Sequence, residues 1–116
     1  MTDKIPLLIL NSLSEAHQAQ LAAVYDIVYA PTAQARAAAV AQHGARFRAV
    51  LTIGVVGITP EEVAAMPKLE LVCCMGAGYE GLPLDLLKSR GIATANGAGT
   101  NDDCVADHAF GLLIGI

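Results

Sequence analysis

The chain has 116 residues, of which 54% are hydrophobic and 16% charged, and its formal net charge is −4. This length is enough to enclose one hydrophobic core, so we expect a folded single unit and not a disordered chain. The seven Lys and Arg residues form no cationic stripe, which disfavours nucleic-acid binding.

No apolar run approaches the roughly 20 residues that a membrane helix needs, so we expect no membrane span. The first apolar run, Pro6 to Leu10, is followed by polar residues where a signal peptide would stay apolar. We therefore expect a cytoplasmic protein.

Strands and helices are expected to alternate along the chain. Five short apolar runs are typical of strands buried on both faces of a sheet. These runs cover Pro6 to Asn11, Tyr25 to Ala30, Arg48 to Ile53, Leu69 to Met75 and Ile92 to Asn96. Five strands joined by helices through short connections predict right-handed crossovers and a parallel sheet. The expected fold class is α/β, a flavodoxin-like three-layer sandwich with strand order 2-1-3-4-5.

Capping patterns predict where the helices begin and end. Ser12 and Glu15 have the spacing of a capping box, and Thr32 is expected to cap a helix that runs to His43. Gly44 is expected to end that helix in a left-handed conformation. The strongest helix start is the run 59–62, Thr-Pro-Glu-Glu, which joins an N-cap hydroxyl, a proline at the first helical position and a carboxylate.

Two more helices are expected after the fourth and fifth strands. One is short, from Leu82 to Arg90, and ends at Gly91. The other starts at Asp102 and is apolar on nearly every side, so its last residues need protein around them. We interpret it as a helix severed from its packing partners.

Two glycine-rich loops are the best candidates for a binding site. They span Gly54 to Gly57, after the third strand, and Met75 to Gly81, after the fourth. In the expected topology they lie side by side at the carboxyl edge of the sheet, where ligands of such folds bind. Bare glycine amides suit a small carboxylate. Tight-turn geometry alone is the alternative explanation of these glycines.

The run 76–81 also matches the dinucleotide fingerprint G-x-G-x-x-G. We do not expect a dinucleotide site there. The run follows the fourth strand, the helix after it is short and contains Pro83, and Asn96 stands where an acid should hold the ribose.

Other chemistry-bearing residues have plainer explanations. The three histidines, His17, His43 and His108, are expected to be solvated or to pack. The acids Asp102 and Asp103 suit the start of a helix, and no metal site is expected. We therefore assign no catalytic and no metal-binding residue in this chain.

Three stretches in this order resemble the D-2-hydroxyacid dehydrogenase family, especially its glyoxylate and hydroxypyruvate reductase branch. They are Leu69 to Leu84 (LELVCCMGAGYEGLPL), Arg90 to Asn96 (RGIATAN) and Gly99 to Ala109 (GTNDDCVADHA). The resemblance is sharp from about Thr52 onward. It implies a two-domain oxidoreductase that transfers hydride between NAD(P)H and a 2-keto or D-2-hydroxy acid. Residues 1–100 would be the flavodoxin-like substrate half, and residues 101–116 a truncated interdomain crossover helix that supports dimerisation.

The resemblance also implies site residues. The backbone amides of Val55, Val56, Gly76, Ala77 and Gly78 would hold the substrate carboxylate, and Asn101 would begin the segment that reaches the cofactor. The cofactor fingerprint and the catalytic arginine, glutamate and histidine would lie beyond residue 116. We therefore expect this fragment to bind no cofactor and to be inactive by itself. Glu80 stands where many members of the family have Asp, and Gly81 replaces a larger residue.

Two alternatives remain at this stage. The chain could be a free-standing flavodoxin-like binding or interaction module, although it has no Trp to stack on a flavin. It could also be a half separated from its missing cofactor domain, whose last helix docks onto the sheet or is exchanged between two chains in a homodimer.

Overall fold

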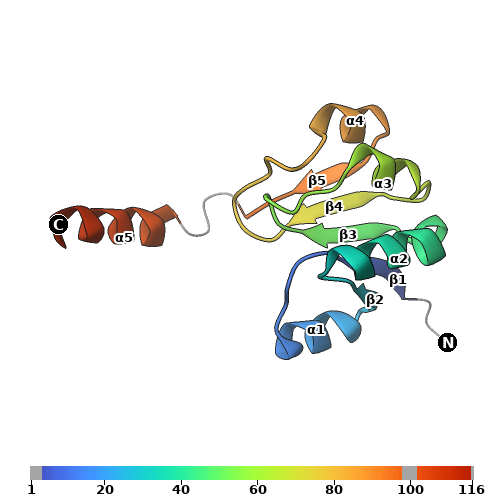
Figure 1. Cartoon of the computed structure of the whole chain (residues 1–116), viewed down its shortest axis with the longest axis horizontal. Helices are drawn as coiled ribbons and strands as arrows, with labels where there is room; N and C mark the ends of the chain where they lie inside the picture. Colours follow the sequence, from blue (N-terminus) through green and yellow to red (C-terminus); the bar gives the residue numbers. More distant parts are fainter. Residues whose placement is uncertain (1–3, 98–101, 116) are drawn as a thin grey trace.

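The computed structural model describes residues 4–97 and 102–115, in which strands and helices alternate (Figure 1). The strands are β1 (Ile5–Ile9), β2 (Tyr25–Tyr29), β3 (Ala49–Thr52), β4 (Leu71–Cys74) and β5 (Ala93–Ala95). The helices are α1 (Glu15–Ala22), α2 (Ala33–His43), α3 (Pro60–Ala64), α4 (Leu84–Ser89) and α5 (Asp102–Gly115), with a 3-10 turn, η1 (Gly44–Arg46), after α2. Every predicted strand is present and shorter than its apolar run by one to three residues.

The five strands form one parallel sheet in the order β2-β1-β3-β4-β5. In the centre of the sheet, Leu8 pairs with Val28 on one side and with Val50 on the other. Val50 in turn pairs with Val72, which pairs with Thr94. This is the flavodoxin-like order that the alternation of strands and helices predicted. It places the ends of β3 and β4 next to each other.

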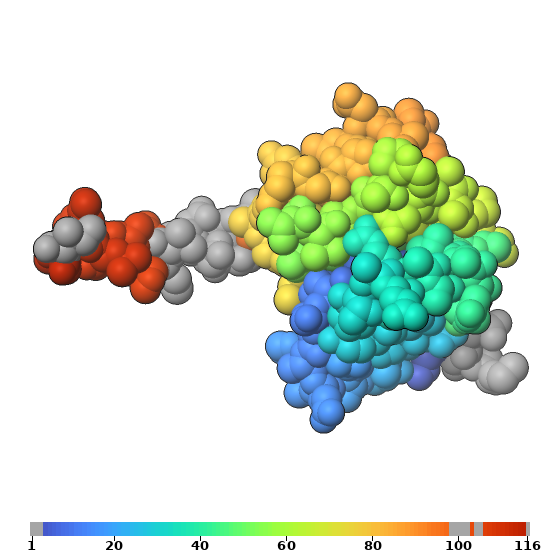
Figure 2. Space-filling model, viewed as in Figure 1, coloured from blue at the N-terminus to red at the C-terminus, as the bar shows by residue number. Residues whose placement is uncertain are grey.

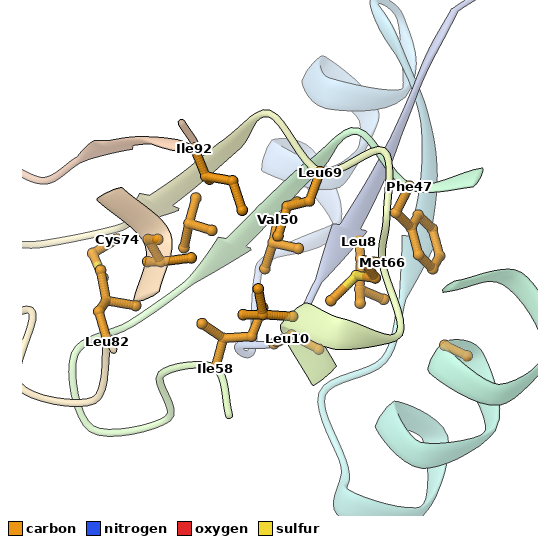
Figure 3. Close-up of a cluster of buried hydrophobic side chains, with 14 of the residues drawn as sticks. Leu8, Leu10, Phe47, Val50, Ile58, Met66, Leu69, Cys74, Leu82 and Ile92 are labelled. Carbon is orange, nitrogen blue, oxygen red and sulfur yellow. The ribbon is translucent and has the colours of Figure 1, made fainter. Parts of the chain in front are cut away.

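The main core lies between one face of the sheet and the helices α2, α3 and α4. It joins strand residues such as Leu8 and Val50 to Ala39 of α2, Val63 of α3 and Leu87 of α4. Figure 3 shows part of this cluster, in which the ring of Phe47 closes one end. Burial of these side chains supplies most of the driving force for folding.

The opposite face of the sheet is covered less completely. Over β1 and β2 it packs against α1 through Leu21. Over β4 and β5 no described helix covers it: Leu71 is 37% exposed, and Ala93 and Ala95 are also exposed. A parallel sheet is normally covered on both faces, so this half of the sheet has room for a further element.

The helix α5 stands apart from the sheet in Figures 1 and 2. Large apolar side chains on it are exposed, with Phe110 at 63%, Leu113 at 70% and Ile114 at 69%. The interpretation of this segment as a severed crossover helix stays a prediction. Among the described helices, none is long and apolar enough to cross a membrane.

The helix caps agree with the sequence at α3 and at the start of α2, where Thr32 accepts a hydrogen bond from the Ala35 amide, and they differ at the start of α1 and the end of α2. Thr59 and Glu62 form the full capping box, with Pro60 at the first position. The proposed Ser12 cap was wrong, because Ser14 caps α1 by accepting a hydrogen bond from the His17 amide. The left-handed end at residue 44 was also wrong.

At that position the backbone stays in the right-handed helical region, with φ −53°, and continues into η1. Gly44 lacks a side chain for a different reason, since a Cβ there would lie 2.8 Å from the carbonyl oxygen of Ala65. The glycine permits close packing of α2 against the end of α3.

Candidate functional site

Two loops meet at the carboxyl edge of the sheet, where β3 and β4 end. The amide of Gly81 donates to the carbonyl oxygen of Gly54 over 2.7 Å, and the amide of Ile58 donates to the carbonyl oxygen of Gly81 over 3.1 Å. We call residues 54–57 the β3 loop and residues 76–81 the β4 loop. The sequence placed these two turns side by side, and the hydrogen bonds between them confirm it.

The close approach of the two loops depends on missing side chains. Gly57 has φ +58°, and a Cβ there would lie 2.1 Å from the Gly81 carbonyl oxygen. A Cβ on Gly81 would lie 2.4 Å from the Gly54 carbonyl oxygen. Loop packing therefore accounts for these glycines without a ligand. Gly76 differs, because it has φ +106° and nothing within 4 Å of its Cβ position.

Seven backbone amides of the two loops donate no hydrogen bond within the described part of the chain. They belong to Gly54, Val55, Gly76, Ala77, Gly78, Tyr79 and Glu80. The amide of Val56 is already used, because it donates to the Ile53 carbonyl oxygen over 3.1 Å. Unpaired N–H groups in glycine-lined turns bind anions. Four of the five residues predicted from the sequence therefore have amides available to a carboxylate.

The end of β5 sets the orientation of the β4 loop. The Gly97 amide donates to the Gly76 carbonyl oxygen over 2.6 Å, and Asn96 Nδ2 donates to the Ala77 carbonyl oxygen over 2.9 Å. In a trans peptide, the carbonyl of one residue and the amide of the next point in opposite directions. The amides of Ala77 and Gly78 therefore point away from β5.

Buried residues hold the loops from below. Thr52 is fully buried, and its Oγ1 donates to the Gly57 carbonyl oxygen over 2.9 Å. Ile58 and Leu82, which follow the two loops in sequence, belong to the main core, as Figure 3 shows. The loops are thus fixed at both ends by side chains in the core.

Arg36 of α2 supports the β3 loop through hydrogen bonds to its backbone. Its guanidinium donates to the Glu62 carboxylate over 2.5 Å and to the carbonyl oxygens of Val56 and Gly57 over 3.4 and 3.3 Å. The hydrogen bond to Glu62 raises the pKa of Arg36. Burial raises the pKa of Glu62, but hydrogen bonds from Arg36 and Thr59 outweigh burial and lower that pKa overall. The pair is charged at neutral pH, and its opposite charges compensate each other.

Glu80 places its carboxylate between the two loops. Its Oε2 lies 2.6 Å from the Cβ position of Gly54 and 2.7 Å from that of Gly78, so both glycines leave space for it. The Cys74 thiol lies below in the core, and its pKa is raised by burial and then by the charges of Cys73 and Glu80. Cys74 is therefore a neutral thiol at neutral pH and not a nucleophile.

Asn11 lies at the end of β1, which neighbours β3 in the sheet. It is 3% exposed, and its Oδ1 accepts no hydrogen bond from any described residue. Its Nδ2 donates to the Ser12 carbonyl oxygen over 3.2 Å. A buried acceptor without a donor costs about 1–3 kcal/mol, so a hydroxyl brought to this point would be stabilised.

The G-x-G-x-x-G match does not form a dinucleotide site. The helix α4 begins only at Leu84, and its N-cap is Pro83, which makes no side-chain capping bond. Gly81 is therefore separated from the helix start, and Asn96 bonds to the β4 loop at the position where a ribose-binding acid would stand. The run 76–81 thus differs from the dinucleotide motif in its distance to the helix start and in the residue at position 96.

Several predicted residues lie outside this edge of the sheet. Asn101 falls outside the described residues. The side chains of His17, His43 and His108 are exposed, as expected for solvated residues. Within residues 4–97 and 102–115, no group of three His, Cys, Asp or Glu side chains is arranged to hold a metal ion.

The strand order defines an α/β domain of the flavodoxin-like kind, with paired glycine loops at the carboxyl edge of its sheet. Comparison with known families gives the particular family. The family model described as D-isomer specific 2-hydroxyacid dehydrogenase, catalytic domain, matches residues 7–111, and the chain belongs to that family. This family consists of NAD(P)-dependent dehydrogenases.

Individual relatives agree with this assignment. The chain is 33% identical over 75 residues to a glyoxylate/hydroxypyruvate reductase of Arabidopsis thaliana, covering 65% of this chain and 23% of the reductase. It is 32% identical over 66 residues to a D-3-phosphoglycerate dehydrogenase of Mycobacterium tuberculosis, covering 57% of this chain and 12% of that enzyme. A solved structure of a 2-hydroxyacid dehydrogenase from Ketogulonicigenium vulgare is similar with a TM-score of 0.87 and 30% identity, over 97% of this chain and 36% of that one. The chain thus spans 12 to 36% of the length of these relatives.

Proposed function

We propose that this chain forms the carboxylate-binding part of an oxidoreductase that transfers hydride between NAD(P)H and a small 2-keto or D-2-hydroxy acid, of the glyoxylate or hydroxypyruvate type. One observation carries the proposal: the unpaired amides of Val55, Gly76, Ala77 and Gly78 lie on two loops that are hydrogen-bonded together at the carboxyl edge. A carboxylate is the group that such donors stabilise best, since hydrogen bonds to a charged acceptor contribute about 1.5–3 kcal/mol each.

These residues bind and orient the substrate in this proposal. Residues 1–100 form the substrate half, and residues 101–116 begin the crossover to a cofactor domain, with Asn101 at its start. NAD(P) supplies or accepts the hydride when it is bound to that partner domain. We assign no cofactor contact to the described residues in this proposal. We expect this chain alone to show no turnover with glyoxylate or hydroxypyruvate and either reduced cofactor.

The proposal is tested by titrating the ¹⁵N-labelled chain with glyoxylate and following its amide resonances. We expect saturable shifts at Val55, Gly76, Ala77 and Gly78. Glycolaldehyde serves as the control, because it has the same two-carbon skeleton and no carboxylate, and it should leave these resonances unchanged. The proposal fails if glyoxylate shifts none of them, or if glycolaldehyde shifts them equally.

A homodimer that involves α5 is a second part of the proposal. The exposed apolar side chains of α5 and the uncovered sheet face over β4 and β5 support it, because burying these apolar surfaces against a second chain would stabilise a dimer. A cytoplasmic location stays a prediction from the sequence. The alternative of a free-standing flavodoxin-like binding module has no observation beyond the fold in its favour.

A further inference from the structure

β5 is an edge strand whose outer side pairs with no described strand. It is the last strand in the order β2-β1-β3-β4-β5, and α4 lies beside it (Figure 1). The Ala93 amide donates to the Glu70 carbonyl oxygen over 2.9 Å, which directs this amide toward β4. Because successive peptide groups of a strand point to alternate sides, the N–H and C=O of Thr94 point outward. One donor and one acceptor are thus exposed in the middle of this edge.

Two cavities lie in line along the β5 edge, on the side of α4. The larger, of about 500 Å³, is lined by Lys88 and the first half of β5, and the smaller, of about 240 Å³, by Tyr79 and the second half. Leu84 and Thr94 line both, so the cavities are neighbours. Side chains on one face of an extended chain are roughly 6.6 Å apart. Two alternate residues of an added strand would therefore each meet one cavity.

The two cavities differ in charge. Lys88 lies four residues after Leu84 in α4, so both side chains are on the helix face that lines the cavities. Among the described residues Lys88 forms no ion pair, and the wall of the larger cavity contains no acidic side chain. The smaller cavity is lined by Leu82, Leu84 and uncharged residues. An acidic side chain is thus complementary to the larger cavity, and an apolar one to the smaller.

The opposite edge of the sheet is built differently. There β2 carries Asp26, which forms an ion pair with Arg46 over 2.8 Å. Charged side chains and prolines on an edge strand discourage the addition of a further strand. β5 has the sequence Ala-Thr-Ala and contains neither. Its small side chains leave the backbone of Thr94 open to a partner.

From these observations we propose that the β5 edge binds an extended peptide as a sixth strand, with an acidic side chain against Lys88 and an apolar one in the smaller cavity. Hydrogen bonds to Thr94 hold the peptide backbone, and the two cavities select its side chains. The acidic and the apolar residue are two positions apart, since only alternate residues of a strand share a face. This surface goes beyond the proposed function, because it needs none of the loop amides that would bind a carboxylate substrate.

The test is an NMR titration of the ¹⁵N-labelled chain with the synthetic peptide acetyl-Thr-Thr-Leu-Thr-Glu-Thr-Thr-amide. Leu precedes Glu because an antiparallel strand, the slightly more stable pairing, passes the smaller cavity first. We expect saturable shifts at Leu84, Lys88 and Thr94. A peptide with Lys in place of Glu should bind about two- to fivefold more weakly, the range of one exposed ion pair. Lys88→Glu should reverse this preference, whereas Lys68→Glu, at an exposed lysine that lines neither cavity, should leave it unchanged.

Thr94→Pro tests the strand addition itself. It removes the outward N–H and no hydrogen bond of the sheet, and proline is tolerated at such edge positions. We expect about tenfold weaker binding of the peptide, with the amide resonances of β1 to β4 preserved. Thr94→Val keeps the N–H and should bind as tightly as the wild-type chain. The inference is overturned if the Leu–Glu peptide shifts no resonance at Thr94, if Lys88→Glu keeps the wild-type preference, or if Thr94→Pro leaves the affinity unchanged.

Discussion

Asn96 donates from its Nδ2 to the Ala77 carbonyl oxygen over 2.9 Å, and this hydrogen bond ties the end of β5 to the β4 loop. Because the amide of Gly78 belongs to the same peptide as that carbonyl, the bond also sets the direction of this amide. Asn96 thus orients a donor of the candidate carboxylate site from the next strand, without needing to touch the ligand.

Replacing Asn96 with Ala should weaken binding more than folding. Loss of one exposed hydrogen bond costs about 0.5–1.5 kcal/mol, so we expect a three- to tenfold higher Kd for glyoxylate. The free energy of unfolding should fall by less than about 1 kcal/mol. Ser89→Ala is the control, because it removes an exposed hydrogen bond within α4, from Ser89 Oγ to the Leu86 carbonyl oxygen, which involves neither loop. Equal affinities of Asn96→Ala and the wild-type chain would contradict this role.

Gly57→Ala should destabilise the fold and abolish binding together. An L-residue at φ +58° is strained by about 1–2 kcal/mol, and a Cβ 2.1 Å from the Gly81 carbonyl oxygen adds an overpacking cost of about 1–3 kcal/mol. Urea unfolding should therefore show a loss of about 2–5 kcal/mol. Gly111→Ala in α5 provides the comparison, because that position is helical and open, and it should be neutral or slightly stabilising. A Gly57→Ala chain as stable as the wild type would show that the loops do not pack as described.

The ion pair between Arg36 and Glu62 makes the free energy of unfolding depend on pH in the acidic range. The pKa of Glu62 is lower in the folded chain than its ordinary value of 4.5. At a pH between the folded pKa and 4.5, the unfolded chain therefore binds more protons than the folded chain. The stabilisation is present above pH 4.5 and is lost as the pH falls through the folded pKa.

Glu62→Gln should remove this dependence and destabilise the chain at pH 7 by about 1–3 kcal/mol, because Arg36 then lacks a charged partner. Thermal unfolding between pH 3 and 7 measures both effects. Glu70→Gln is the reference, since its pair with Arg48 is exposed and contributes little. The explanation is wrong if Glu62→Gln and the wild-type chain lose stability in parallel below pH 5.

The sequence predicted the fold well, because the relevant signals are local. Apolar runs identified all five strands, and the box at Thr59 was correct in every hydrogen bond. Local signals failed where two suitable N-cap residues lie close together in sequence, as Ser12 and Ser14 do before α1. They also failed where a distant contact decided the conformation, as at Gly44, which packs against Ala65.

The candidate site was predictable in place but not in detail. Glycine-rich turns after adjacent strands located the two paired loops. The hydrogen bond that uses the Val56 amide and the position of the Glu80 carboxylate depend on loop conformation, which no spacing rule gives. The Arg36–Glu62 pair joins residues 26 apart in sequence. The one available hint was a single arginine in the otherwise Ala-rich helix α2.

The apolar face of α5 should determine the association state in solution. Phe110 and Leu113 lie three residues apart on this helix and are 63% and 70% exposed, so burial in a second chain would stabilise a dimer. Size-exclusion chromatography with light scattering should show a dimer for the wild-type chain and a monomer for the double variant Phe110→Ser with Leu113→Ser. Gly111→Ala lies between them on the same helix and should leave the dimer intact, which separates loss of apolar surface from loss of helix. A wild-type chain that stays monomeric at high concentration would mean that α5 is not the dimer contact, and its apolar residues would then need a partner other than a second copy.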